Sequence, residues 1–405
     1  MTDRTDAAET QAVQGHPGEV FRAFLKLGLT SFGGPIAHLG YFRDELVTRR
    51  GWLGDAAYAD LVALCQFLPG PASSQVGFAL GLMRAGWLGA LAAFIAFTLP
   101  SALILLVFAM TAATVTGPVG AGAVDGLKIV AVAIVAQAVW GMAKTLCPDR
   151  ERASIAVAAV VIVAFVPGAP GMVGAIGIGA FAGWGLGRGT KKQVGGHVTM
   201  PVGRVQAGFC LAVFAALLIV LPLFADAAQV LAVMDGFYRS GALVFGGGHV
   251  VLPLLQAETV AAGWVTPDTF LAGYGAAQAV PGPLFTFAAY LGAVLGPEPN
   301  GIAGAVIALS ALFLPGFLIL SGVLPFWDRF RTMVTAQSLM QGANAAVVGI
   351  LGAALYSPVF TSAIADMRDF ALALVCLGLL MAWKMPPWAV VIVAALGGAG
   401  LSLTA

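Results

Sequence analysis

The chain has 405 residues, of which 60% are hydrophobic and 10% are charged, and its formal net charge at pH 7 is +1. Soluble domains are roughly 45–50% apolar and about 25% charged, so this composition excludes an ordinary soluble protein and predicts an all-α polytopic membrane protein. The small net charge excludes a strongly basic nucleic-acid-binding protein, and no basic run is interleaved with aromatic residues.

Residues 1–18 are polar and lack the apolar core of a secretory signal, so we interpret them as a cytoplasmic tail. A helix that crosses a bilayer needs about 20 apolar residues. Segments of this kind are Trp87–Ala112, Ala121–Ala143, Ala207–Ala225, Gly301–Leu324 and Ala336–Tyr356. The cysteines have no paired spacing and the histidines are scattered, so we expect no metal site and no cofactor.

A short pattern occurs twice inside apolar stretches, as QFLPGP at residues 66–71 and QAVPGP at residues 278–283. Pro-Gly-Pro cannot continue a helix, because proline removes a backbone donor and clashes with the preceding turn. A second interruption lies upstream of each copy, as FGGP at residues 32–35 and FGGG at residues 245–248. Paired helix breaks in two halves of a membrane chain point to the binding site of a transporter.

The two halves also match residue by residue. At a shift of 213 (245 minus 32) seven residues are identical and the cation Lys26 falls on the cation Arg239; after one gap the shift becomes 212 through the second pattern. We therefore predict two homologous units, 19–187 and 232–405, joined by residues 188–231, which hold a basic linker and one connecting helix.

Basic residues then predict the topology, because short cytoplasmic loops carry lysine and arginine. The linker holds Arg188, Lys191 and Lys192 without an acid, and the loops around Arg49 and Arg150 also carry bases. The segments between these internal loops must turn back at the breaks, and each arm of about 13 residues is roughly 20 Å long, too short to cross. We expect two re-entrant hairpins and about four spanning helices in each unit, a cytoplasmic N-terminus, and an inverted second unit.

Proline or glycine at the breaks starts a new helix at the membrane midplane, where free N–H groups and the positive end of the helix dipole favour an anion. Neutral donors lie beside the breaks, and Lys26 and Arg239 are the nearest cations. The candidate substrate-binding residues are Lys26, Gly33, Gly34, Pro35, Gln66, Gly70, Pro71, Ser73, Ser74, Arg239, Gly246, Gly247, Gly248, His249, Gln278, Gly282, Pro283 and Thr286.

Other interpretations of these residues stay open. Gln66 and Gln278 are equally suited to satisfying backbone groups freed by the break, and Lys26 to reaching the membrane surface. Glu45, Glu258 and Asp60 are candidates for proton coupling, although pairing of Glu45 with an arginine four residues on is the more ordinary role.

Enzyme templates are absent: the sequence contains no H-E-x-x-H, no G-x-S-x-G and no G-x-x-x-x-G-K-[ST] motif. We therefore expect no enzymatic activity, and transport would draw on an ion gradient or on the gradient of the substrate itself.

The segment Phe24–Gly28, the FGGP motif, the Gly51-Trp52 pair and the QFLPGP motif, with their degenerate second copy, resemble the chromate ion transporter family in its two-domain form. The resemblance covers nearly the whole chain from about residue 19. The second copy departs from the first at Gly248 and His249, where the first has proline and isoleucine.

The resemblance implies an inner-membrane protein of bacteria that expels chromate, confers chromate resistance and couples to the proton motive force, with sulfate as a competing oxyanion. The family motifs correspond here to Lys26, Gly33, Gly34, Pro35, Gln66, Pro69, Gly70 and Pro71, and in the second copy to Gly246, Gly247, Gln278, Pro281, Gly282 and Pro283. The alternatives are uptake or exchange of sulfate, and a membrane scaffold that transports nothing. The expected partners are the anion and membrane lipid, and a homodimer stays open.

Overall fold

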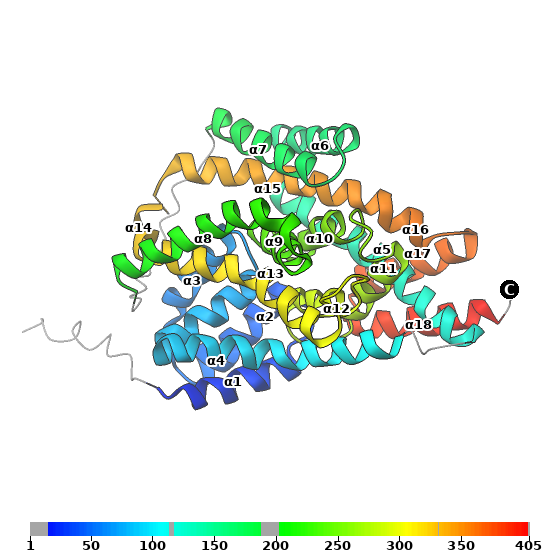
Figure 1. Ribbon diagram of the computed structural model, residues 1–405, viewed down its shortest axis with the longest axis horizontal. Coiled ribbons are helices and arrows are strands. Elements are labelled where there is room, and N and C mark those ends of the chain that lie inside the picture. The colour runs from blue at the N-terminus through cyan, green and yellow to red at the C-terminus, as the bar shows by residue number, and fades with distance from the viewer. Residues whose placement is uncertain (1–14, 113–116, 188–201, 331, 404–405) are drawn as a thin grey trace, which may run out of the picture.

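The computed structural model describes residues 15–112, 117–187, 202–330 and 332–403, and these residues form helices and no strands (Figure 1). Most of the predicted cytoplasmic tail lies outside the described residues. The same is true of three topology markers predicted in the linker, Arg188, Lys191 and Lys192.

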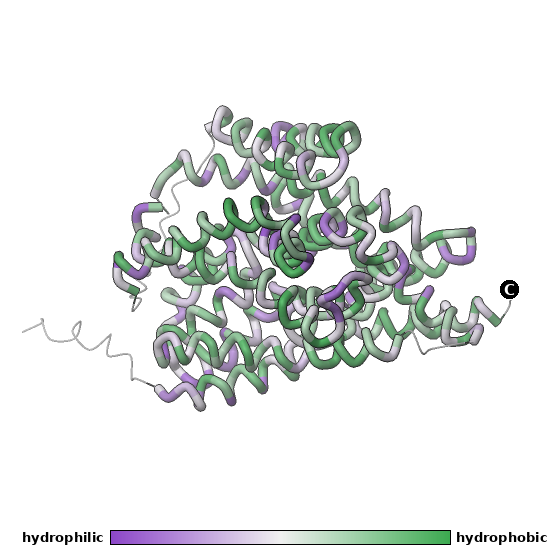
Figure 2. Tube along the Cα trace, in the orientation of Figure 1, coloured by the Kyte–Doolittle hydropathy of each residue, from purple (hydrophilic) through white to green (hydrophobic). Residues whose placement is uncertain are grey.

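Among the described residues, six helices are long and apolar enough to cross a membrane. They are α4 (Ala72–Ala112), α5 (Pro118–Leu146), α7 (Ala169–Leu186), α8 (Arg204–Phe224), α13 (Gly301–Val323) and α15 (Val334–Ala354). The five apolar segments expected from the sequence match five of them, three of the segments running one or two residues past the C-terminal end of the helix, and α8 is the expected connecting helix. Hydrophobic residues cover the long helices, and hydrophilic ones gather mostly at turns and helix ends (Figure 2). The prediction of a polytopic α-helical membrane protein is confirmed.

The first half begins with short helices separated by the expected breaks. These are α1 (Pro17–Thr30), α2 (Gly34–Phe42) with its π-helical continuation η1 (Arg43–Arg49), and α3 (Asp55–Phe67). The chain leaves the helical conformation at residues 31–33 and 68–71, where glycines adopt positive φ angles that other residues avoid. Helix α4 then bends sharply at Ala85 and Gly86, so that its two parts touch through Gly81 and Gly89.

The second half has the same order of short elements. They are α9 (Gln229–Ala242), η3 (Gly248–Val250) with α10 (Val251–Thr259), α11 (Pro267–Ala277), and η4 (Leu284–Thr286) with α12 (Phe287–Ala293). Its breaks fall at residues 243–247 and 278–283. A turn at residues 294–300 separates α12 from α13, at the place where α4 has only its bend.

Glycines set how closely the first helix of each half approaches a long helix. In α1, a Cβ atom on Gly28 would meet the backbone carbonyls of Ala96 and Phe97 in α4, both at 2.8 Å. In α9, a Cβ atom on Gly241 would meet the carbonyl of Leu312 in α13. Helices α4 and α13 also contact each other, with the rings of Phe78 and Phe317 stacked at 4.4 Å.

The remaining helices interlock the two halves. Helices α6 (Arg150–Phe165) and α7 of the first half pack on α15 of the second, and α17 (Met367–Met381) and α18 (Pro387–Ser402) of the second half pack on α5 of the first (Figure 1). Small residues allow these contacts, since Gly183 lies on Gly342 and Gly126 lies on Ala394. The short connecting elements are η2 (Ala225–Ala227), η5 (Leu324–Phe326), α14 (Trp327–Phe330), η6 (Leu355–Phe360) and α16 (Thr361–Ala363).

Candidate functional site

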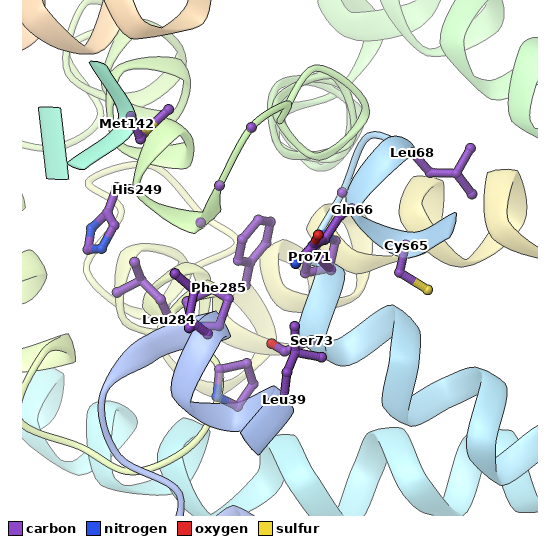
Figure 3. A pocket seen from close by; sticks show the side chains of 18 of the residues that line it. Leu39, Cys65, Gln66, Leu68, Pro71, Ser73, Met142, His249, Leu284 and Phe285 are labelled. Atoms are coloured by element: carbon purple, nitrogen blue, oxygen red, sulfur yellow. The ribbon is translucent and has the colours of Figure 1, made fainter. Parts of the chain in front are cut away.

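Three of the four helix breaks, and the start of α2 that follows the remaining break, line one cavity of about 330 Å³ (Figure 3). From the first half it is lined by Pro35, Ile36, Leu39, Cys65, Gln66, Leu68, Gly70, Pro71, Ala72, Ser73, Met142 and Leu146, and from the second by Gly246, Gly247, Gly248, His249, Pro283, Leu284, Phe285 and Asn344. Segments more than 200 residues apart in sequence therefore share its walls.

Two backbone hydrogen bonds tie the breaks of one half to those of the other. The N–H of Gly70 donates to the carbonyl of Val244 at 2.8 Å, and the N–H of Gly282 donates to the carbonyl of Ser31 at 2.9 Å. The shifts found in the sequence relate Gly70 to Gly282 and Ser31 to Val244, so the two bonds are reciprocal. Each Pro-Gly-Pro segment is held against the Phe-Gly-Gly segment of the opposite half.

Glycine is required at these segments by conformation and by space. Gly70 has φ +118°, and a Cβ atom there would lie 3.0 Å from the Cα of Gly316 in α13. Gly282 has φ +95°, and a Cβ atom there would lie 2.8 Å from Oγ of Ser101 in α4. Each Pro-Gly-Pro segment thus crosses the long helix of the other half so closely that an added Cβ atom would force its neighbours to shift.

Four helices begin at the cavity: α2, α4, η3 and η4. The first amides of a helix have no acceptor within it, and the dipole places partial positive charge there. Pro35 lies in the first turn of α2 as expected, but Pro71 and Pro283 lie one residue earlier, at the N-cap. The carbonyl of Pro71 accepts from the N–H of Gln75, which makes it the residue before the first helical turn.

The cavity is uncharged, and its largely apolar wall carries a few polar side chains. None of its lining residues in the described part of the chain is Lys, Arg, Asp or Glu, and its polar side chains include Gln66, Ser73, His249 and Asn344. Nδ1 of His249 lies 2.8 Å from the Tyr274 hydroxyl, and the buried Oδ1 of Asn344 has no hydrogen-bond partner among the described residues. The site therefore presents neutral donors and helix starts to a ligand.

Several expected site residues lie beside this cavity instead of on it. Gly33, Gly34, Gln278 and Gly282 line a second cavity of about 20 Å³. Ser74 and Thr286 are buried, and the Thr286 hydroxyl donates to the carbonyl of its own N-cap proline at 2.7 Å.

The two expected cations form ion pairs away from both cavities. Nζ of Lys26 lies 2.7 Å from Glu45, which also pairs with Arg49 and Arg50. In the second half Arg239 lies 3.0 Å from Glu258. Glu45 and Glu258 occupy matching positions of the two halves, and each forms an ion pair with the cation of its own half. The pairing of Glu45 with Arg49, four residues further on, is also present.

The third acid suggested for proton coupling is also buried away from the cavities. Oδ1 of Asp60 in α3 accepts a hydrogen bond from the Trp327 indole at 3.2 Å. This contact joins α3 to the end of α13 through the short helix α14.

The sequence analysis missed two polar residues at the site. Asn344 is one of three amide side chains in the apolar segment Ala336–Tyr356, with Gln337 and Gln341, and a polar side chain within a membrane-spanning segment is the signal that could have identified it. Gln75 lies behind the cavity, where its Nε2 donates to the carbonyls of Pro69 and Gly316, both at 2.9 Å. Its role depends on the other half of the chain and leaves no local signal.

Comparison with known proteins adds an independent line of information. The chromate transport protein of Pseudomonas aeruginosa is 29% identical over 412 aligned residues, which cover 98% of this chain and 95% of that protein. The chromate transport protein of Cupriavidus metallidurans is 26% identical, with 89% and 87% covered, and the probable chromate transport protein of Synechococcus elongatus is 25% identical, with 93% of each covered. No solved structure matches the chain.

A family model described as chromate transporter matches residues 18–184 and again residues 231–399, more than half of the chain. Each match contains one Phe-Gly-Gly and one Pro-Gly-Pro segment, the segments that meet at the cavity. The chain therefore belongs to the chromate transporter family.

Proposed function

We propose that this chain carries chromate out of the bacterial cytoplasm across the inner membrane, driven by the proton motive force, and so confers chromate resistance. The observation that carries the proposal is the cavity at the helix breaks, where helix starts and neutral polar side chains surround a space large enough for a tetrahedral oxyanion. The names of the relatives point to the same anion.

An uncharged site suits a transported dianion. Dipoles and N–H donors replace part of its hydration shell, and without a fixed positive charge the anion is not held too tightly to be released. We propose direct contact for the lining residues, among them Gln66, Ser73 and His249. For Lys26 and Arg239 the contacts support a different role, namely holding the arms of the hairpins through their acids.

We further propose that the segments 17–49 and 55–84 are re-entrant hairpins. Helices α1 and α3 have 14 and 13 residues, hence roughly 20 Å of length against about 30 Å of hydrocarbon. The ends of these hairpins gather at one surface, where Glu19 at the start of α1 pairs with Arg84 at the bend of α4 at 3.1 Å and accepts from Trp52 at 3.2 Å. This geometry supports a chain that enters and leaves on one side.

The proposed units are 19–187 and 232–405, with the second inverted relative to the first by α8 in the 188–231 connection. The reciprocal hydrogen bonds at the breaks support this, because an axis that exchanges the halves would exchange the two bonds. The surface with Arg49, Arg50 and Arg84 would then be cytoplasmic, and so would the N-terminus.

The test is chromate flux in liposomes that contain the purified protein, with and without an imposed pH gradient. We expect chromate to leave the compartment that faces the Arg84 surface, and sulfate to compete. Flux only in the opposite direction would favour sulfate uptake or exchange, and absence of both binding and flux would favour a scaffold and refute the proposal.

Cavity filling provides the residue-level test. A Cβ atom on Gly246 would lie 3.1 Å from Leu146 and 3.5 Å from Met142, so Gly246→Leu places a large side chain among the lining residues. We expect chromate binding to be lost. Gly141→Leu is the matched control, because a Cβ atom there meets nothing within 4 Å. Unchanged binding by Gly246→Leu would contradict the assigned site.

Proton coupling is tested separately. If Glu258 or Glu45 carries the proton, the glutamine variants should bind chromate normally while their flux no longer responds to the pH gradient. A wild-type response in both variants would show that these acids only hold the hairpin arms.

A further inference from the structure

The small cavity is the counterpart of the large one. Eight of the nine residues that line the small cavity stand 212 or 213 positions from a residue that lines the large one. Examples are Gln278 with Gln66, Val280 with Leu68, and Gly282 with Gly70. The two cavities are therefore built from the same positions of the two halves.

Their sizes differ strongly, about 330 Å³ against about 20 Å³. The ninth residue of the small cavity, Pro387 at the start of α18, has no counterpart in the wall of the large one. Beside it the ring of Trp388 lies 6.2 Å from the ring of Phe32 at the first Phe-Gly-Gly segment. The start of α18 thus covers this segment and closes the small cavity.

Two residues line both cavities, His249 and Leu284. Figure 3 shows both side chains at the same wall of the large cavity, across from Gln66 and Pro71. His249 is held from behind by the hydroxyl of Tyr274, which is itself fully buried. A ligand that passed from one cavity to the other would have to pass this wall.

We propose that the small cavity is a second oxyanion subsite, closed in this structure, and that His249 and Leu284 form the barrier between it and the open subsite. The proposal rests on the proposed function. In the opposite state the small cavity opens as α18 moves away from Phe32. Ile36 and Ala72, which are the counterparts of His249 and Leu284 in the first half, then become the barrier that closes the large cavity. Exchange of the two conformations between the halves then moves the anion across without an open channel.

The large cavity belongs to the side of the membrane that carries Arg84. Its walls follow α2 from the break to Leu39 and reach Leu146 at the end of α5, close to the ion pair of Arg152 with Asp149. Of the break glycines in the first half, only Gly70 is among its walls, whereas Gly33 and Gly34 face the small cavity. The two subsites should therefore be reached from opposite sides.

Single cysteines at the matched glutamines test this directly. The four native cysteines, one of which (Cys65) lines the large cavity, are first replaced by serine, and flux of this background is verified. A membrane-impermeant thiol reagent should modify Gln66→Cys from the Arg84 side, and should modify Gln278→Cys only from the other side and about tenfold more slowly than Gln66→Cys. Modification of both from one side at equal rates would overturn the proposal.

A filled small cavity gives a second test that does not need labelling. Val280 lines only the small cavity, so Val280→Phe should leave chromate binding within about twofold of wild type and slow flux at least about tenfold by opposing the opening. The matched variant Leu68→Phe intrudes on the large cavity and should weaken binding itself. Wild-type flux in Val280→Phe would refute the second subsite.

These outcomes separate the two proposals. If the protein does not carry chromate, wild type shows neither binding nor flux, but the opposite-side labelling of the two cysteines still stands. If chromate is carried through one cavity alone, wild-type flux is present and both the labelling pattern and the effect of Val280→Phe are absent.

Discussion

Gly70→Ala should damage this protein through both its backbone conformation and its packing. The residue has φ +118°, and an added Cβ atom would lie 3.0 Å from the Cα of Gly316 and 3.0 Å from Nε2 of Gln75. Gly316 offers a backbone atom of α13, which cannot rotate away as the end of a flexible side chain can. The Pro-Gly-Pro segment, and not the long helix, therefore has to shift.

Two contributions set the size of the effect. Holding alanine at a positive φ costs about 1–3 kcal/mol, and overpacking against α13 costs about 1–3 kcal/mol. The sum, about 2–6 kcal/mol, is a large part of a typical folding free energy of about 5–15 kcal/mol. Because the shift also moves a wall of the cavity, we expect the chromate affinity to fall at least about tenfold, or about 1.4 kcal/mol.

Thermal unfolding in detergent and chromate titration measure these two effects. Gly51→Ala is the matched control, because Gly51 also has positive φ, +60°, but an added Cβ atom there meets nothing within 4 Å and the residue lies outside both cavities. The free energy of unfolding of Gly51→Ala should fall by only about 1–2 kcal/mol, and its chromate affinity should equal that of wild type. If Gly70→Ala matched this control in both measurements, the close crossing of the Pro-Gly-Pro segment over α13 would be wrong.

Three further variants test the packing around the site. Gln75→Leu should lower the melting temperature and the chromate affinity together, because it removes both hydrogen bonds of the Gln75 amide and deprives the carbonyl of Pro69 of this donor, at about 1–3 kcal/mol; a variant as stable as wild type would contradict this. Arg239→Met should lower the free energy of unfolding by up to about 3–5 kcal/mol, because the two carboxylates that pair with Arg239 are only 9% and 14% exposed. Lys26→Met should lower it by about 0–1 kcal/mol, because the Lys26 side chain is 48% exposed. A tenfold loss of chromate affinity in either variant, about 1.4 kcal/mol, would instead indicate that the cation contacts the anion. Gly126→Ala should lower the melting temperature, because its Cβ atom would meet the backbone of α18, whereas Gly141→Ala should not, and equal melting temperatures would count against the interlocked helices.

Much of the site could be predicted because its determinants are local. Proline ends a helix because its φ angle is fixed and it has no N–H group, and glycine does so because it accepts a positive φ angle. These are properties of single residues, so the four breaks, and the start of a new helix after each break, follow from the sequence. Spanning helices follow equally from runs of apolar residues, and the matched order of landmarks suggested that the breaks of the two halves would meet.

The neighbours of each break could not be predicted, because they come from distant parts of the chain. Gln75 and Gly316 are 241 residues apart, and nothing near either residue indicates their hydrogen bond. The same holds for Asn344, which the docking of α15 brings into the cavity. The pairing of Arg239 with Glu258, only 19 residues further on, instead removes a sequence candidate from the cavity.

The sequence by itself determined where this chain leaves the helical conformation and which residues prefer lipid, since both depend on the chemistry of single residues and their immediate neighbours. Only the tertiary structure decided which of the polar residues face the cavity, and that one of two nearly equivalent cavities is wide while the other is closed by α18. Two halves with matching sequence patterns can dock in either of two opposite arrangements, and the choice between them depends on packing across the whole molecule.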